Sequence, residues 1–187
     1  MKTPNPTPLN LKLATGTDVA FVAATVATEP RRFSGIANSG RPFVLGDINM
    51  VVDFEGIQYK AKTAVLVDHS GGRIAGVAEL SVTADGLLAS GTLLGNEHGQ
   101  AVAAASDEGF PWEMSAYVQA ARYEELLSGA TATVNGHEVS GPMLIMRDCT
   151  IREVSFMPTA GPMCAAAVFS ATKPTAFIST KAIILLM

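Results

Sequence analysis

The sequence is poor in cysteine and in charged residues, and both shortages narrow the classes of function that fit it. The two cysteines, Cys149 and Cys164, form neither a Cys-x-x-Cys pair nor a disulfide framework, so we expect reduced, buried thiols as in a cytosolic protein. Charged residues make up 16% of the chain, the formal net charge is −4, and the absence of a basic cluster argues against a nucleic-acid groove. With 48% hydrophobic residues, the 187-residue chain has the composition of one compact globular domain.

Motifs for metal, phosphate and α/β-hydrolase chemistry are also missing. The three histidines lack Glu-x-x-His or His-Glu-x-x-His spacing, so we expect no metal. The Ser-Gly-Gly sequence at residues 70–72 lacks the Lys-Ser/Thr of a phosphate loop, and we expect no cofactor. No Gly-x-Ser-x-Gly motif occurs, which argues against the nucleophile elbow of an α/β-hydrolase.

Long hydrophobic runs are absent as well. The most apolar segment, residues 176–178 with 182–187, is shorter than the roughly 20 helical residues that cross a bilayer, so we expect no membrane partner. Residues 1–8 are proline-rich and polar and do not resemble a signal peptide. We expect a flexible arm over residues 1–16, a barrel domain over 17–170, and a tail over 171–187 that is sticky or the remnant of a linker to scaffold.

What is present is a series of short apolar, β-branched runs separated by turn signals. This pattern predicts a mainly β fold of the α+β type, a barrel or curled sheet with few helices. Hairpins are predicted around Glu55-Gly56, residues 83–86 and Asn135-Gly136. Strands are expected at residues 18–27, 32–37, 46–54, 58–62, 64–67, 74–82, 87–94, 115–118, 132–134, 138–139, 143–146 and 150–156.

One helix is predicted over residues 97–108, with Asn96 as its N-cap and Gly109 just past its end. Residues 119–127 fit a helix or a strand, and we favour an extended conformation. Residues 165–169 are left open between a helix and a strand. The Ser-Gly-Gly sequence at residues 70–72 is expected to form a sharp turn after the strand at 64–67.

Ser115 is the candidate nucleophile, although a serine in a strand is more often structural. It follows the Phe-Pro-Trp corner at residues 110–112, which holds the only tryptophan. A free hydroxyl is a poor nucleophile near neutral pH and needs a base. His98 lies in the first turn of the predicted helix, where an imidazolium is disfavoured, and His137 follows an exposed turn. By elimination, His69, at a strand end before a glycine turn, is the best partner.

Glu153 is the candidate for the third role. Period-two alternation in the strand at 150–156 places Glu153 on one face with Ile151 and Ser155, and Arg152 on the other with Val154 and Phe156. A carboxylate on an otherwise apolar strand needs a partner, which an imidazole would supply. Arg147 or Lys62 would supply one too, in a purely structural role, and Asp148 is the competing acid.

Four segments together resemble the prohead, or capsid maturation, proteases of tailed phages, with the Mu-like phage protease as the most similar branch. They are Arg-Phe-Ser-Gly-Ile-Ala at 32–37, Val-Asp-His at 67–69 with Arg-Ile-Ala-Gly at 73–76, Gly-Phe-Pro-Trp-Glu-Met-Ser at 109–115, and Ile-Arg-Glu-Val-Ser-Phe at 151–156 followed by Pro158. Each segment is modestly specific, and their order and spacing are more so. The resemblance covers about residues 32–167.

The resemblance implies an assemblin-like β-barrel serine protease with a few flanking helices, similar to the herpesvirus assemblins. It carries Ser115 over as nucleophile and His69 as general base. The third member is a second histidine in the herpesvirus enzymes and an acid in the phage branch, where Glu153 occupies the matching strand. An oxyanion hole in the loop around residues 159–161 is expected by analogy. The chain departs from the family because no acidic, scaffold-like helical region follows Phe169.

The implied role is proteolysis during virion assembly in the host cytoplasm, inside the assembling procapsid. The expected substrates are the phage scaffold protein, the major capsid protein and the protease itself. Because herpesvirus relatives dimerise, a homo-oligomer is a further expected partner, although the sequence shows no clean interface helix. The main alternative is a non-enzymatic head-assembly or scaffold-associated β-domain, and an unrelated small-ligand barrel has less support.

Overall fold

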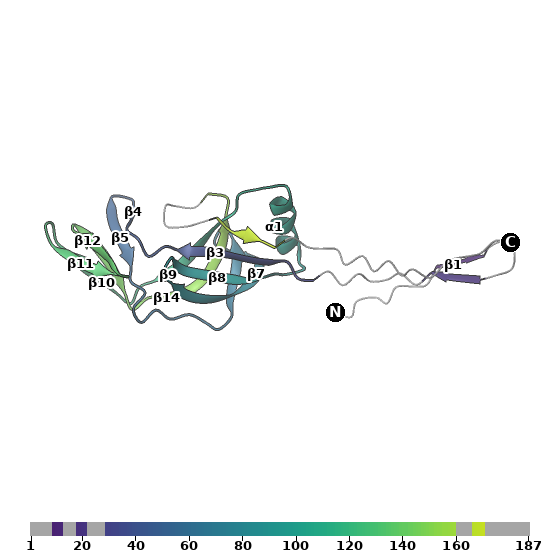
Figure 1. Ribbon diagram of the computed structural model, residues 1–187, viewed down its shortest axis with the longest axis horizontal. Helices are drawn as coiled ribbons and strands as arrows, with labels where there is room; N and C mark the ends of the chain where they lie inside the picture. Colours follow the sequence, from purple (N-terminus) through teal and green to yellow (C-terminus); the bar gives the residue numbers. More distant parts are fainter. Residues whose placement is uncertain (1–8, 13–17, 22–28, 160–165, 171–187) are drawn as a thin grey trace. The chain divides into compact units, whose positions relative to one another are not determined.

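A computed structural model of the chain describes residues 9–12, 18–21, 29–159 and 166–170 (Figure 1). The chain divides into two units, one comprising Met1–Glu29 with Thr172–Met187 and the other comprising Pro30–Ala171. In the first unit, β1 (Leu9–Lys12) pairs antiparallel with β2 (Asp18–Phe21).

A seven-stranded sheet forms the main body of the second unit, in the order β15-β3-β8-β7-β6-β14-β9. Neighbouring strands are antiparallel except β6 and β14, which run parallel. In chain order the strands are β3 (Arg32–Asn38), β6 (Thr63–Val67), β7 (Ser70–Thr83), β8 (Gly86–Leu93), β9 (Glu113–Gln119), β14 (Thr150–Met157) and β15 (Val168–Phe169).

The two edges of this sheet are linked to each other by residues 166–169. Ala166 forms a β-bridge with Glu113 at the start of β9, and the Ala167 N–H donates to the Trp112 carbonyl at 2.8 Å. Two residues later, β15 pairs with β3. The sheet therefore curls and joins its edges, and its buried side chains fill the interior as one core.

Phe156 on β14 lies at the centre of that core and is 0% exposed. Its ring packs edge-on against Phe33 with centroids 5.0 Å apart, and also contacts Phe169 and Trp112. The aromatic cluster thus joins β3, β14, β15 and the Phe-Pro-Trp corner before β9. Burial of large rings stabilises the barrel, because each removes a large apolar area from water.

A four-stranded sheet, in the order β10-β13-β5-β4, and a separate hairpin complete the unit. Asn135 in the hairpin turn connects the hairpin to the rest, because its side chain donates to the Gly40 and Val52 carbonyls and accepts from the Phe54 N–H. The strands are β4 (Phe43–Leu45), β5 (Ile48–Val52), β10 (Arg122–Leu126), β11 (Thr131–Val134), β12 (His137–Ser140) and β13 (Met143–Arg147).

Helix α1 (Glu97–Asp107) packs against β7 and β8 and leads into the Phe-Pro-Trp corner (Figure 1). The Asn96 side chain accepts from the Gly99 N–H at 2.9 Å, so the predicted N-cap is confirmed. Gly109 follows the helix with φ of +85°, a left-handed conformation that glycine adopts without a Cβ clash. α1 is the one helix among the described residues.

The mainly β fold with a curled sheet is confirmed, including the hairpins at residues 83–86 and at Asn135-Gly136. The hairpin predicted around Glu55-Gly56 is wrong. Residues 58–62 form no strand, and β5 instead pairs with β4 across a turn at Gly46-Asp47. The expected turn at residues 70–72 is also displaced, because the chain reverses at Asp68-His69 and Ser70 already begins β7.

Of the strand expected at residues 18–27, Asp18–Phe21 forms β2, which pairs with β1 in the first unit. Residues 22–27 lie outside the described residues, as do Cys164, residues 1–8 and 13–16 of the expected arm, and the tail at 171–187. Among the described residues, no helix has the length and apolar character that crossing a membrane requires.

The aromatic core gives a prediction about stability. Phe156→Ala should lower the free energy of unfolding by about 3–5 kcal/mol, because it removes a fully buried ring and leaves a cavity. Tyr123→Ala is the matched control, since Tyr123 is 56% exposed and its loss should cost about 0.5 kcal/mol or less. Denaturant titration of both variants measures the difference, and equal destabilisation would contradict the proposed centre of the core.

Candidate active site

Three neighbouring strands bring Ser115, His69 and Glu153 together. β14 lies between β6, which ends at Val67 just before His69, and β9, which carries Ser115. In the register of β14 with β9, Ser155 lies directly opposite Ser115, so Glu153 and Ser115 share one face of the sheet. Ser115 is 46 residues from His69 along the chain and Glu153 is 84 residues from it, yet all three meet on one surface.

The three side chains form one continuous hydrogen-bonded chain. His69 Nε2 lies 3.1 Å from Ser115 Oγ, and His69 Nδ1 lies 2.5 Å from Glu153 Oε1. When Nδ1–H donates to the carboxylate, the Nε2 lone pair is free to accept the Ser115 hydroxyl proton. The order of hydroxyl, imidazole and carboxylate is the same as in a Ser-His-Asp triad.

The His69 imidazole is partly shielded, with 33% of its side chain exposed, and the Glu153 side chain is 13% exposed. The hydrogen bond that His69 Nδ1–H donates to Glu153 raises the pKa of His69 above its usual 6.5, although burial acts in the opposite direction. The charges of Glu153 and Asp68 also raise this pKa. The imidazolium that forms when His69 takes a proton is therefore stabilised by its surroundings.

His69 is held in an unusual backbone conformation. Asp68 and His69 connect β6 to β7 as a two-residue turn, and both have positive φ, of 57° and 50°. Two-residue hairpin turns of this kind strongly favour glycine at the second position, because a Cβ is disfavoured there. A histidine in this left-handed conformation raises the energy of the backbone. This cost points to a role for the histidine side chain.

Two hydrogen bonds join this turn to β14. The Asp68 N–H donates to the Phe156 carbonyl at 3.0 Å, and the His69 N–H donates to Ser155 Oγ at 3.2 Å. The Ser155 hydroxyl donates in turn to Glu153 Oε2 at 2.8 Å. The alternation of the sequence places Ser155 on the face of Glu153, but no sequence signal assigns it to the site.

A β-bulge changes which residues of β14 share a face with Glu153. The register of β14 with β9 shifts between Ile151 and Glu153, where Arg152 is exposed. The simple alternation predicted from the sequence is therefore wrong at this end of the strand. Ile151 belongs to the buried face with Val154, whereas Arg152 does not, and only Ser155 remains with Glu153 as predicted.

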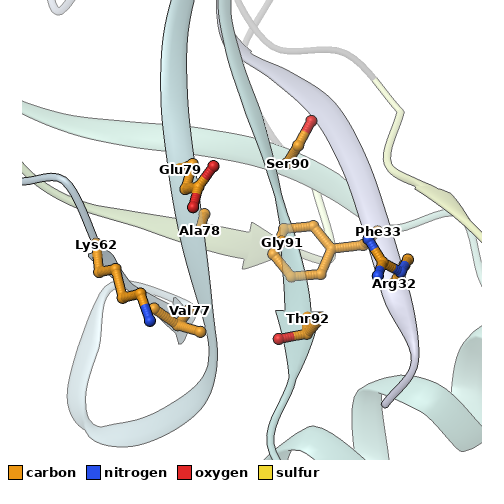
Figure 2. A pocket seen from close by; sticks show the side chains of 9 residues that line it. All are labelled: Arg32, Phe33, Lys62, Val77, Ala78, Glu79, Ser90, Gly91 and Thr92. Atoms are coloured by element: carbon orange, nitrogen blue, oxygen red, sulfur yellow. The ribbon is translucent and has the colours of Figure 1, made fainter. Parts of the chain in front are cut away.

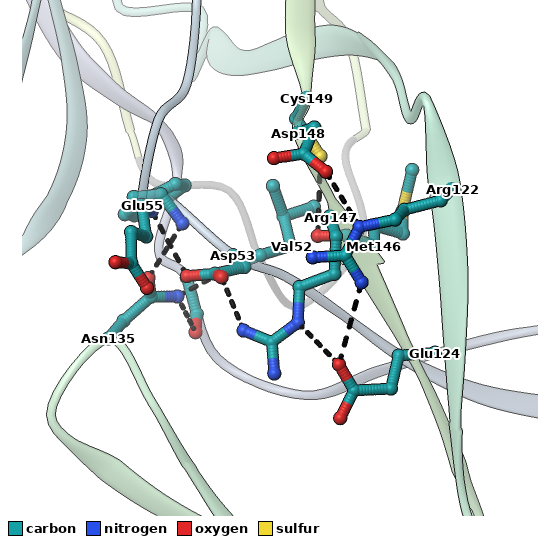
Figure 3. A network of polar contacts seen from close by, with 12 residues as sticks. Val52, Asp53, Glu55, Arg122, Glu124, Asn135, Met146, Arg147, Asp148 and Cys149 are labelled. Atoms are coloured by element: carbon teal, nitrogen blue, oxygen red, sulfur yellow. Dashed lines mark hydrogen bonds and ion pairs between the residues drawn. The ribbon is translucent and has the colours of Figure 1, made fainter.

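The competing acid, Asp148, lies elsewhere in the structure. Its carboxylate accepts a hydrogen bond from Arg122 Nε at 2.7 Å (Figure 3). Arg147, the alternative partner for Glu153, instead pairs with the buried Asp53 and with Glu124. This polar network joins β5, β10 and β13 and shares no member with the Ser115 site.

The buried Cys149 lies beside the same network (Figure 3). Its thiol donates to the Met146 carbonyl at 3.3 Å. Burial raises its pKa to about 11, with smaller contributions from Asp53 and Asp148, so the thiol stays protonated near neutral pH. The expectation of a reduced, buried thiol is confirmed for Cys149.

The remaining candidates are also separate from the site. Lys62 lines a cavity of about 410 Å³ on the surface of β3, β7 and β8, where Figure 2 shows it together with Glu79, Ser90 and Thr92. His98 Nε2 lies 3.5 Å from Oε1 of Glu97, the preceding residue of α1. His137 lines a different cavity. Among the described residues, the imidazole that lies within hydrogen-bond distance of Ser115 Oγ is that of His69.

The expected oxyanion loop at residues 159–161 begins at the exposed Thr159, and residues 160–161 lie outside the described residues. No cluster of histidine, cysteine or carboxylate side chains suited to a metal ion occurs in the described part of the chain.

Comparison with known proteins gives no match to this chain among protein-family models, curated proteins or solved structures. The chemistry of the site therefore rests on its own geometry and on the residues that compose it.

The raised pKa of His69 gives a prediction that separates the two acids. In Glu153→Gln, the pKa of His69 should fall towards about 6.5, because the hydrogen bond and charge that raise it are lost. In Asp148→Asn it should stay unchanged, since Asp148 pairs with Arg122. NMR titration of the His69 ring measures both values, and His98 and His137 serve as internal references. A shift in Asp148→Asn alone would move the third role to Asp148.

The same raised pKa affects stability in a defined direction. The protonated imidazole is favoured in the folded state, so this stabilisation is fully present below the pKa of the unfolded state. It is lost as the pH rises through the higher pKa of the folded state.

The positive φ of His69 gives a second prediction. His69→Gly should be more stable than His69→Ala by about 1 kcal/mol, because both lose the imidazole and only alanine has a Cβ in the left-handed region. Ala104→Gly in α1 is the control. In a helix interior glycine is less stable than alanine, so this replacement of alanine by glycine should destabilise the protein. Thermal or denaturant unfolding measures all three variants, and a more stable His69→Ala would contradict the strained turn.

Proposed function

We propose that this protein is a serine endopeptidase, with Ser115 as nucleophile, His69 as general base and Glu153 as the acid that orients His69. The supporting observation is the unbroken set of hydrogen bonds from Ser115 Oγ through both imidazole nitrogens to the Glu153 carboxylate. Each contact has the atom pairing that general-base activation of a serine needs.

The first half of the reaction forms an acyl-enzyme. His69 Nε2 takes the Ser115 hydroxyl proton as Oγ attacks the carbonyl carbon of the scissile peptide bond, and the C–N bond then breaks as His69 returns that proton to the leaving amine. Glu153 accepts from Nδ1–H throughout and stabilises the imidazolium. A water molecule, deprotonated by His69, then hydrolyses the ester, and the proton returns to Ser115.

The resemblance of four sequence segments to phage prohead proteases supports a narrower role for this chemistry. The substrates proposed on that basis are the scaffold protein and the major capsid protein of a tailed phage, cleaved inside the assembling procapsid in the host cytoplasm. The protease would also cut itself. The segments that carry the resemblance include those that contribute His69, Ser115 and Glu153.

Covalent labelling tests the enzymatic proposal directly. A fluorophosphonate probe should modify the wild-type protein at Ser115 and leave Ser115→Ala unmodified, because only an activated hydroxyl reacts. Ser81→Ala, at an exposed serine of β7, is the matched control and should label like wild type. Mass spectrometry of the probe adduct identifies the modified residue.

The biological role is tested by co-expression with the neighbouring scaffold and capsid proteins. Wild type should generate shorter products of the scaffold, and Ser115→Ala should abolish them while the fold survives. Labelling without any cleavage of these partners would retain the serine hydrolase and reject the prohead role. Unchanged cleavage by Ser115→Ala would remove the nucleophile assignment, and the absence of both activities would favour the non-enzymatic head-assembly domain.

A further inference from the structure

Ser155 occupies a central position beneath the proposed triad. It lies on β14 two residues after Glu153 and directly opposite Ser115 on β9. The residue is 0% exposed, which is uncommon for a serine and requires that its hydroxyl be hydrogen-bonded. Both of its hydrogen bonds go to residues of the site, one to the backbone of His69 and one to the side chain of Glu153.

We propose that Ser155 is a positioning residue of the peptidase, which fixes the His69 backbone and the Glu153 carboxylate relative to each other. This inference rests on the proposed function, because it concerns the same reaction. Ser155 has no role of its own in bond making or breaking.

A hydroxyl can make both contacts that this role requires. A serine hydroxyl has one proton to donate and two lone pairs to accept with. Its proton goes to Glu153 Oε2 at 2.8 Å, and one lone pair accepts the His69 N–H at 3.2 Å. Glu153 Oε1 is then left for the imidazole, at 2.5 Å. Each carboxylate oxygen has one partner, so the plane of the carboxylate is fixed at two points.

The contact with His69 matters because that residue sits in a strained turn. A left-handed conformation of a residue with a Cβ persists only when the surroundings hold it. The Ser155 hydroxyl and the Phe156 carbonyl are the two groups of β14 that bind the turn amides. Only the hydroxyl also reaches the acid, so Ser155 couples the direction of the imidazole to the direction of Glu153.

The experiment compares Ser155→Ala with Ser155→Thr in the full chain. Labelling of Ser115 by the fluorophosphonate probe is followed as a rate against pH, and the His69 ring is titrated by NMR. Ser155→Ala should label about 10- to 100-fold more slowly at its plateau, which corresponds to the loss of one hydrogen bond to a charged group. Its His69 pKa should move towards the usual value, because the contact with Glu153 loosens. Ser155→Thr retains the hydroxyl and should restore most of both.

Thr63→Val is the matched control for loss of a hydroxyl from a buried strand. Thr63 lies on the adjacent β6, is 2% exposed and donates to the Lys60 carbonyl, away from the site. It should lower the melting temperature without changing the labelling rate or the His69 pKa. Should Ser155→Ala fail to fold, Ser155→Cys fills the site with a slightly larger side chain and a weaker donor, and it should show the same two changes to a smaller degree.

The outcomes separate this inference from the proposed function. Wild-type labelling at Ser115 together with an unchanged rate and an unchanged His69 pKa in Ser155→Ala would overturn the positioning role alone. Failure of the wild type to label would overturn the peptidase, and the role of Ser155 in its mechanism with it. A rate loss in Ser155→Ala that Ser155→Thr does not recover, with His69 unaffected, would reduce Ser155 to a packing residue.

Discussion

The position of β14 between β6 and β9 is the constraint on which the candidate site depends. Val154 and Phe156 are 0% exposed and direct one face of β14 into the core. Their burial fixes the register, because a shift by one residue would send the apolar face to solvent. The residues between and beside them, Ser155 and Glu153, must then face the turn at the end of β6 and the nucleophile on β9. Core packing thus sets the geometry of a polar site that contributes little to the core itself.

Local signals were sufficient for elements whose boundaries are marked by turn or cap chemistry. The helix with Asn96 and Gly109 at its ends and the Asn135-Gly136 hairpin follow from the backbone preferences of these few residues. The hairpin prediction failed at Glu55-Gly56, because β5 has a different strand partner. Glu55-Gly56 does form a turn, but residues 57–62 after it form a single β-bridge, between Gln58 and Thr150. The strand partner of β5 lies before it, and that choice depends on tertiary packing.

The residues of the site were predictable in identity and less so in arrangement. Ser115, His69 and Glu153 follow from chemistry, elimination and a resemblance, and the structure brings all three together. The function of Ser155 was not predictable, since it depends on a cross-strand register and on the reversal of the chain at Asp68. The bulge at residue 152 was equally hidden, because a bulge breaks the period-two rule from which the faces of a strand are inferred.

The site combines three features that each cost stability and that a passive β-domain does not need. A histidine occupies a turn position suited to glycine, a largely buried carboxylate lies beside it, and a fully buried hydroxyl is used only to connect the two. Each of these three features lowers the stability of the fold. Burial of the Glu153 carboxylate, for example, carries a desolvation cost that its hydrogen-bond partners must offset. Stability is commonly sacrificed where activity needs strain and pre-organised polar groups. Because all of these costs converge on the hydrogen-bonded neighbours of Ser115, the proposed catalytic role accounts for them together, whereas the alternative head-assembly role would leave each without a cause.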